Sequence, residues 1–329
     1  MDVSTFCAQS HVLVMAGKGG VGKTTMSAAV ARMASDVGKS VLIVELEGKS
    51  GINGAFGRAG DLGYEEEVLS GSGGGSGGGR GTIRARRLTP DDALVEYLED
   101  HGLRSVSKRL ARSGVLDVVA TAIPGIRDVL VLGKVKQLER AREADLIVVD
   151  APATGHAVTF LTSARGMVDA ARGGPLRAQA EDVVELLSDP SRCRVMLVTL
   201  PEELPVSETI ESAYTLEDKA GVQLGPVIVN ACDPAPVGLE RPAFEVVRAA
   251  GLAGAVPPAH VAALEEAREF RLARHMVSAE QVERLGRELP LPHLLVPSLD
   301  ADRIGPAETQ VLADALAGAV GALVPERAG

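Results

Sequence analysis

Short apolar runs alternate with helical segments along the chain. The first run, His11–Ala16, is followed at once by glycines, and Thr25–Val37 then carries alanines at helical spacing. A second continuously apolar run spans Ser40–Leu46. Continuous apolar strands are typical of parallel sheets, because helices cover both faces of such sheets. The pattern therefore predicts a strand, a glycine turn, a helix and a second strand.

Four further apolar runs each end at a polar or turn residue. They span Leu146–Val149, Val195–Leu200, Val227–Val229 and Leu294–Val296. The residues that follow them are Asp150, Pro201, Asn230 and Pro297. Strand ends of this kind line the ligand crevice of a doubly wound sheet. We therefore expect an α/β fold with a mostly parallel sheet, and these four residues on one rim.

Longer stretches between the apolar runs have the pattern of helices. They are Pro90–Arg142 with a break at Pro124–Gly125, Ser163–Ser188, Leu239–Arg287, and Pro306 to about Leu323. Two helical insertions, at about 90–143 and 163–190, are expected within a single domain over residues 1–329. An apolar stripe at helical spacing indicates core packing rather than a client surface. Its members are Val129, Leu132, Val135 and Leu138.

A glycine and serine tract at residues 70–81 is typical of a flexible spacer. It separates an acidic segment, Tyr64–Leu69, from a basic one, Thr82–Leu88. These two segments either pair as neighbouring strands or flank a surface loop. The tract is natural or engineered, and nothing in the sequence decides between the two.

Composition narrows the class of protein. Hydrophobic residues make up 46% of the chain but aromatics only 2%, with no Trp, so the core is expected to be aliphatic. The net charge of −10 argues against nucleic-acid binding. There is no apolar run of membrane-spanning length and no secretory signal, and the three cysteines form no CxxC. We expect a cytoplasmic protein without stable membrane insertion.

The glycines after the first predicted strand form a phosphate-binding pattern, G-x4-GK[ST]. Its residues are Gly17, Lys18, Gly19, Gly20, Val21, Gly22, Lys23, Thr24 and Thr25. Glycines let consecutive backbone N–H groups turn towards an anion at the start of a helix. Lys23 is expected to reach the β- and γ-phosphates of a nucleoside triphosphate, and the Thr24 hydroxyl to bind Mg²⁺.

The second lysine of this loop is informative. With Lys18, the segment GKGGVGKTT resembles the deviant Walker A group of ATPases. That resemblance implies a dimer in which Lys18 reaches the phosphates bound by the partner subunit. Such a lysine delivers a cation in trans to the charge on the transferring phosphoryl group.

Three further segments resemble the family of arsenical pump-driving and tail-anchored-protein-targeting ATPases. Asp150–Leu161 is similar to the D-x-A-P-T-G-H-x-x-x-F-L switch, with Ala and Pro exchanged, and Ala122–Asp128 to a P-G-I-D/E segment. Glu45–Phe56 stands where the family has its first switch, and the V-E-x-E-G pattern resembles the bacterial branch. The resemblance spans nearly the whole chain. It implies a P-loop NTPase fold and a dimeric switch driven by hydrolysis of ATP to ADP and phosphate.

The resemblance also implies roles for single residues. Asp150 holds Mg²⁺ through water, and Glu47 orients the attacking water, with Glu45 as the alternative when the segment is aligned from the strand. Asn230 reads the adenine and Pro297 packs on the base. A competing interpretation takes Asn230–Asp233 as the N-K-x-D guanine motif, although its lysine is Ala231 here. His156 belongs to the second switch.

The chain departs from the family in its cysteines. It lacks the zinc-binding CxxC of the eukaryotic targeting enzymes, so no zinc is expected. Cys193 starts a predicted strand and Cys232 lies just beyond the end of another. In a parallel sheet these thiols lie at opposite ends, which argues against arsenite as a ligand.

The expected function is therefore a Mg²⁺-dependent ATPase switch, either a homodimer or a heterodimer with a paralogous ATPase subunit, acting on a client that the sequence does not identify. Lys18, Lys23, Glu47 and Asp150 are its expected catalytic residues. A partitioning or positioning ATPase is the alternative, but such proteins need a basic DNA surface or a basic tail. A redox protein like the nitrogenase iron protein would need paired interface cysteines, which are missing.

Overall fold

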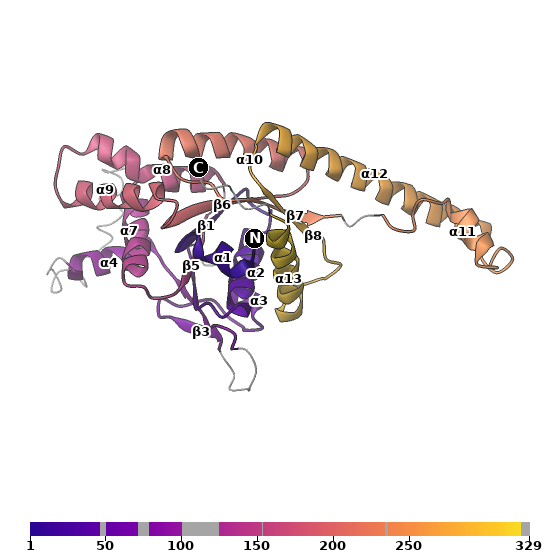
Figure 1. The fold of residues 1–329 in the computed structure, drawn as a ribbon, viewed down its shortest axis with the longest axis horizontal. Coiled ribbons are helices and arrows are strands. Elements are labelled where there is room, and N and C mark those ends of the chain that lie inside the picture. The colour runs from indigo at the N-terminus through magenta and orange to yellow at the C-terminus, as the bar shows by residue number, and fades with distance from the viewer. Residues whose placement is uncertain (47–50, 72–78, 101–124, 153, 234–235, 324–329) are drawn as a thin grey trace.

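The computed structural model describes residues 1–46, 51–71, 79–100, 125–152, 154–233 and 236–323. Its centre is a sheet with the strand order β3-β4-β2-β5-β1-β6-β7-β8 (Figure 1). The strands are β1 Val12–Ala16, β2 Val41–Glu45, β3 Glu67–Ser70, β4 Ile83–Arg87, β5 Leu146–Asp150, β6 Cys193–Thr199, β7 Val227–Cys232 and β8 His293–Pro297. Every neighbouring pair is parallel except β3 and β4. The predicted doubly wound α/β fold is confirmed.

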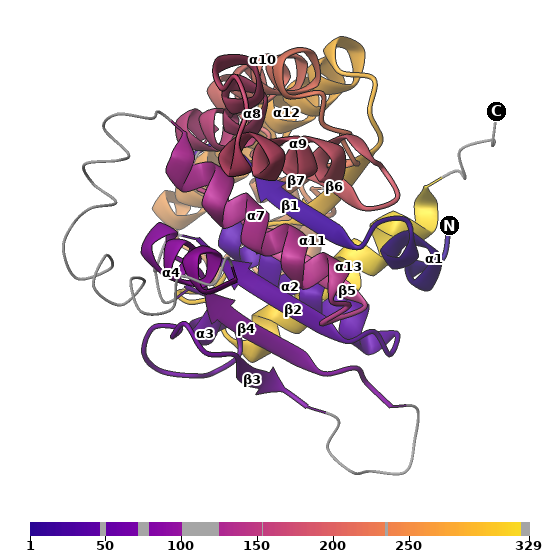
Figure 2. The same cartoon turned by 90° about the vertical axis from the view of Figure 1, so that its left-hand side faces the viewer.

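Helices cover both faces of this sheet (Figures 1 and 2). One layer contains α2 Lys23–Asp36, α3 Gly51–Ala55 and α13 Pro306–Ala322, with α1 Val3–Ala8 beside α13. The opposite layer contains α4 Pro90–Asp100, α7 Ile126–Arg140, α8 Thr154–Ala170, α9 Pro175–Ser188, α10 Glu203–Thr215 and the π-helical turn Leu216–Ala220. Because both faces are covered, every residue of β1, β2 and β5 is buried.

The acidic and basic segments around the glycine and serine tract do pair. Strands β3 and β4 are antiparallel neighbours at one edge of the sheet. An ion pair of 2.6 Å between Arg84 Nη1 and Glu66 Oε2 supports the pairing. Residues 72–78 of the tract lie outside the described residues.

Several boundaries differ from the predicted ones. Helix α8 begins at Thr154 rather than near Ser163, because the Thr-Gly-His segment is itself the first turn of the helix. Strand β7 continues through Asn230 to Cys232, although the apolar run stops at Val229. The stretch 90–143 contains α4 and α7, and residues 101–124 between them lie outside the described residues. The short helix α1 has no counterpart in the predicted pattern.

The apolar stripe of α7 belongs to the core, as its spacing indicated. Its four side chains are at most 5% exposed: Val129, Leu132, Val135 and Leu138. They pack with α8, α9 and one face of the sheet in a single cluster. These four side chains are therefore packed in the core rather than exposed to solvent.

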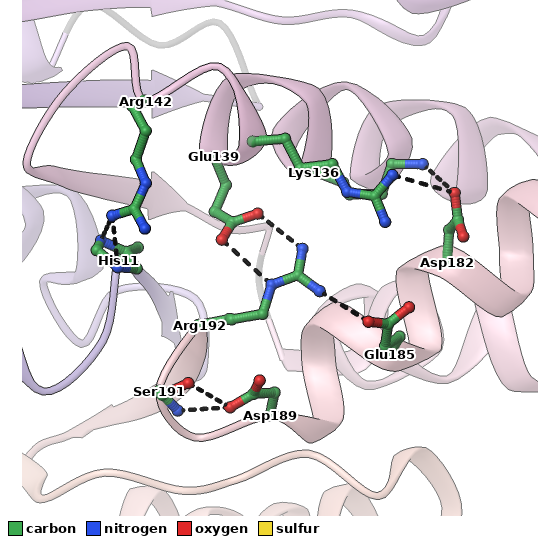
Figure 3. A network of polar contacts seen from close by, with 10 residues as sticks. His11, Lys136, Glu139, Arg142, Asp182, Glu185, Asp189, Ser191 and Arg192 are labelled. Atoms are coloured by element: carbon green, nitrogen blue, oxygen red, sulfur yellow. Dashed lines mark hydrogen bonds and ion pairs between the residues drawn. The ribbon is translucent and has the colours of Figure 1, made fainter.

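Polar contacts fasten α7 to α9 and to the start of β6 (Figure 3). Glu139, which is 7% exposed, accepts hydrogen bonds from Arg192 Nε at 3.2 Å and Nη2 at 2.7 Å. Lys136 Nζ donates to Asp182 Oδ2 at 2.5 Å. We call these four residues the α7–α9 clamp. Each charge in it has a partner of opposite sign, which offsets the penalty of burial.

Two helices between β7 and β8, α11 Ala243–Ala249 and α12 Pro258–Glu288, form an arm that extends away from the sheet (Figure 1). The arm is held by local contacts, such as the 3.0 Å bond from Arg268 Nη1 to Leu239 O. It exposes large apolar side chains, among them Phe244, Leu264, Phe270 and Met276. In the described part of the chain, no helix is both long and apolar enough to cross a bilayer.

Candidate active site

The predicted phosphate-binding loop connects β1 to α2, and its glycines adopt conformations that other residues avoid. Gly20 and Gly22 have φ of +88° and +93°. A Cβ on Gly22 would lie 2.4 Å from Asn230 Nδ2, and one on Gly17 would lie 2.2 Å from Val198 O. Real Cβ atoms do not approach other atoms so closely. Gly17 and Gly22 thus let the loop pack against β6 and Asn230. A Cβ on the exposed Gly20 would meet nothing within 4 Å, so this side of the loop is an open cradle next to the first turn of α2, where backbone N–H groups favour an anion.

Lys23 is the first residue of α2, directly after the cradle. Its Nζ donates to the backbone oxygen of Lys18 at 3.1 Å, so the ammonium lies across the loop. Val21, 1% exposed, fixes the loop to the core, whereas Gly19 and Gly20 are exposed. The predicted loop residues are therefore brought together, with the Lys23 ammonium against the backbone of the same loop.

Asp150 ends β5 beside this loop and is 6% exposed. Its Oδ2 accepts from Thr24 Oγ1 at 2.7 Å and its Oδ1 from Ser27 Oγ at 3.0 Å. Thr24 and Asp150 were both predicted to hold Mg²⁺, whereas Ser27, which lies on the same face of α2 three residues after Thr24, was not predicted. The two hydroxyls fix the orientation of the carboxylate.

This pair fits Mg²⁺, which prefers oxygen ligands and is often held by one or two protein oxygens together with phosphates and water. Thr24 would supply a direct oxygen ligand, and Asp150 would hold the ion through water. Among the described residues, no group of three or more His, Cys, Asp or Glu is arranged to hold a metal by itself. A magnesium ion that shares its coordination with a nucleotide does not require such a group.

Of the two candidate water-orienting carboxylates, Glu47 lies outside the described residues. Glu45 ends β2, is 1% exposed and is paired in register with Asp150 on the neighbouring strand β5. Paired residues of parallel strands point to the same face, so both carboxylates face α2. Either glutamate as the water-orienting group stays a prediction.

Lys18 forms an ion pair that the sequence did not indicate. Its Nζ lies 2.6 Å from Oε1 of Glu208, a residue of α10, and both side chains are about one third exposed, at 35% and 33%. The two residues are separated by 190 positions in the chain. They meet because α10 follows β6, the strand next to β1.

Asn230 and Pro297 lie near the ends of β7 and β8, at the same edge as the loop. Asn230 Nδ2 donates to Val21 O at 2.9 Å, which ties β7 to the phosphate-binding loop. Just after it, Ala231 has a φ of +54° and the pairing of β7 with β8 shifts in register. The strand is therefore irregular where base recognition was expected.

Asp233, the last residue of the competing guanine motif, is paired with Arg274 of α12 at 3.4 Å. Beside it is a cavity of about 480 Å³ between the ends of β6 and β7 and α12. Pro201, the fourth predicted rim residue, lines this cavity together with Ala231 and Phe270. The four predicted rim residues thus all lie at the carboxyl edge of the sheet.

His156 is an exposed residue of α8, and it faces the first turn of α7. Burial raises the pKa of Asp128 there, and the nearby charges of His156 and Arg127 oppose that shift. This proximity links the segment after Asp150 to α7. The assignment of His156 to a switch remains a prediction.

Two of the cysteines lie at opposite edges of the sheet, as the sequence predicted. Cys193 begins β6 and Cys232 ends the neighbouring parallel strand β7, so the two thiols are at opposite edges. Burial raises the pKa of Cys193 to about 12 and that of Cys232 to about 11. Because they lie at opposite edges of the sheet, the two thiols cannot both bind one ion.

Comparison with known proteins finds similarity to ATPases. A family model described as anion-transporting ATPase matches residues 10–69 and 92–171. The ATPase BagA of Mycobacterium tuberculosis is 38% identical over 231 residues, which is 68% of this chain and 65% of the relative. The arsenical pump-driving ATPase of Escherichia coli is 28% identical over 233 residues, 69% of this chain and 36% of that protein. The ATPase Get3 of Schizosaccharomyces japonicus is 30% identical over 149 residues, or 45% and 42% of the two chains.

The matched residues include the phosphate-binding loop and Asp150. The chain spans less than two thirds of the length of these relatives, at 65% for the mycobacterial protein. The loop, the parallel sheet and the matches to known proteins together support an ArsA-like, anion-transporting ATPase family for this chain.

Proposed function

We propose that this protein is a Mg²⁺-dependent ATPase whose nucleotide state controls the association of two subunits. The observation that carries the proposal is the 2.7 Å contact between Thr24 Oγ1 and Asp150 Oδ2 beside the open glycine cradle. A hydroxyl and a carboxylate at this position are the protein ligands that a nucleotide-bound magnesium ion takes in P-loop enzymes. Bound Mg²⁺ neutralises charge on the β- and γ-phosphates.

The other residues of the site have separate roles in this proposal. The backbone N–H groups of residues 17–25 bind the phosphates, and the Lys23 ammonium stabilises the charge that develops on the transferring group. Ser27 holds Asp150 in position through its 3.0 Å hydrogen bond. A carboxylate at Glu47 or Glu45 orients the attacking water.

Two contacts favour ATP over GTP as the substrate. A guanine motif requires a carboxylate that accepts from the base, but Asp233 is paired with Arg274 and is only 13% exposed. The Asn230 side chain meanwhile donates to Val21 O and presents its amide at the loop. We therefore assign the base site to adenine, with Asn230 and Pro297 as its contacts.

Lys18 is the residue that we assign to contact with a second subunit. In this proposal Lys18 reaches the phosphates bound by a partner, which is either a second copy of this chain or a paralogous ATPase subunit. Closure of the pair around two nucleotides, and its relaxation after hydrolysis, is the signal passed to a client protein.

The test measures subunit association and phosphate release together. Sedimentation with ATP and Mg²⁺ should reveal a larger species that is absent with ADP. Removal of either ammonium, in Lys23→Ala or Lys18→Ala, should reduce turnover at least about 100-fold. Mixing the two inactive variants should restore part of the activity, because one subunit then supplies Lys18 to the intact loop of the other. Wild-type turnover in both single variants would contradict the mechanism.

A further inference from the structure

Lys18, the lysine assigned to a partner's phosphates, is bound within its own subunit. Its Nζ lies 2.6 Å from Glu208 Oε1, which is a charge-assisted hydrogen bond between partly exposed groups. Lys18 lies in the loop after β1, and Glu208 lies on α10, which follows β6. The pair therefore joins the loop to a helix of the opposite layer.

The helix that carries Glu208 is itself held in place. Ser207, the preceding residue, accepts a hydrogen bond from Arg284 Nη1 of α12 at 3.1 Å and donates to Glu203 O at 2.8 Å. Tyr214 at the other end of α10 donates to Glu288 O at 2.7 Å. Helix α10 is thus fastened to the base of the arm, so Glu208 is presented from a fixed position.

A lysine ammonium is a compact point charge on a flexible stem. While Lys18 lies 2.6 Å from Glu208, its charge is already compensated and one of its N–H donors is used within its own subunit. We propose that Glu208 restrains Lys18 within its own subunit, so that release of this ion pair is a required step of ATP-dependent association. The inference rests on the proposed function and specifies how its site is regulated.

The exposure of the pair sets the size of the effect. Both side chains are about one third exposed, and ion pairs of this kind are weak because water and salt screen them. A restraint of this strength shifts an association equilibrium about twofold to fivefold. The free energy of nucleotide binding is therefore enough to break the ion pair. Added salt should weaken the ion pair and so reduce the restraint on association.

The experiment compares Glu208→Gln with Glu211→Gln in the full chain. Both substitutions remove one negative charge from exposed or partly exposed positions of α10, but only the first removes the partner of Lys18. Sedimentation is followed over a range of protein concentrations with Mg²⁺ and a non-hydrolysable ATP analogue. Glu208→Gln should lower the concentration for half-maximal association about twofold to fivefold, and Glu211→Gln should leave it unchanged. Glu208→Ala should act in the same direction as Glu208→Gln.

Two further measurements separate a restraint from a structural effect. In a Lys18→Met background, Glu208→Gln should have no further influence on association. Nucleotide binding by the isolated subunit should stay within about twofold of wild type, since Glu208 contacts the side chain of Lys18 and not the backbone N–H groups of the loop.

The outcomes are distinct. If the wild type associates with nucleotide and Glu208→Gln associates equally or less well, the restraint is wrong while the proposed function stands. If the wild type neither associates nor hydrolyses ATP, the proposed function fails and this inference fails with it.

Discussion

The carboxyl edge of the sheet and the α7–α9 clamp use the same kinds of charged residue for different purposes. In the clamp, Glu139 and Lys136 are nearly buried, and each is held by an oppositely charged partner across two elements (Figure 3). At the carboxyl edge, Asp150 is held by two hydroxyls and Lys23 contacts a backbone oxygen. The clamp thus joins nearly buried charges across elements of the fold. At the carboxyl edge, the hydroxyls of Thr24 and Ser27 and the backbone of the loop set the positions of two charged groups next to the phosphate-binding loop.

The largest expected effect is on hydrolysis at the carboxyl edge. Asp150→Asn keeps the shape of the side chain but removes the charge that faces the magnesium position, so turnover should fall at least about 100-fold. Because the hydroxyls of Thr24 and Ser27 can still hydrogen-bond to an amide, the free energy of unfolding should change by less than about 1 kcal/mol. Steady-state phosphate release and denaturant unfolding measure the two quantities.

Asp145→Asn is the matched control for that substitution. Asp145 precedes β5 at the opposite edge of the sheet and accepts from Ser40 N at 2.8 Å. Its replacement should leave turnover at the wild-type value. Equal loss of activity in both variants would show that the carboxyl edge is not the reactive one.

A substitution in the clamp should lower stability and leave turnover nearly unchanged, the reverse of the effect expected for Asp150→Asn. Glu139→Gln leaves Arg192 without its bidentate partner in a largely buried position, which should lower the free energy of unfolding by about 2 kcal/mol. Turnover of the folded protein should remain within about twofold of wild type. Glu185→Gln serves as control, because Glu185 is 66% exposed and lies 3.4 Å from the same guanidinium. An equal loss of stability in the control would contradict the clamp.

Alanine variants of two loop glycines distinguish the effect of a strained backbone from the effect of a steric collision. Gly20→Ala meets nothing within 4 Å and should lower the free energy of unfolding by about 1–2 kcal/mol through its positive φ alone. Gly22→Ala adds a collision with Asn230 and should weaken ATP binding more than Gly20→Ala does. Calorimetric titration and thermal unfolding of the two variants provide the comparison. Equal ATP affinities of the two variants would show that Asn230 does not contribute to ATP binding.

The smallest effect concerns pH. Burial lowers the pKa of His293 below its usual 6.5, so the folded state favours the neutral ring. The unfolded chain takes up the proton more readily, and stability therefore falls as the pH decreases below about 6.5. His293→Gln should flatten the pH dependence of unfolding between about pH 7.5 and pH 5.5. An unchanged slope would exclude His293 as its source.

Features that depend on neighbouring residues could be predicted from the sequence, whereas contacts between segments far apart in the chain could not. The loop of residues 17–25 was predictable because its glycine spacing is local, and so were the buried strands β1, β2 and β5, whose apolar runs are continuous. The start of α8 at Thr154 was missed because the first turn of the helix carries Gly155 and polar residues in place of an apolar period. The extension of β7 was missed because Asn230 is a poor strand former.

The contacts between distant segments were not predictable from local pattern. Lys18 and Glu208 are 190 positions apart, and Glu139 and Arg192 are 53 apart. Nothing local marks one glutamate of a helix as the partner of a particular cation. Ser27 likewise has the pattern of an ordinary helix residue until α2 is placed against the end of β5.

The most direct test of the central claim is a calorimetric titration of the full chain with ATP and Mg²⁺. We expect saturable binding with one nucleotide per chain, at least about tenfold weaker binding of GTP, and loss of binding in Lys23→Ala. An absence of binding heat for ATP in the presence of Mg²⁺ at all accessible temperatures, or equal affinity in Lys23→Ala, would contradict it.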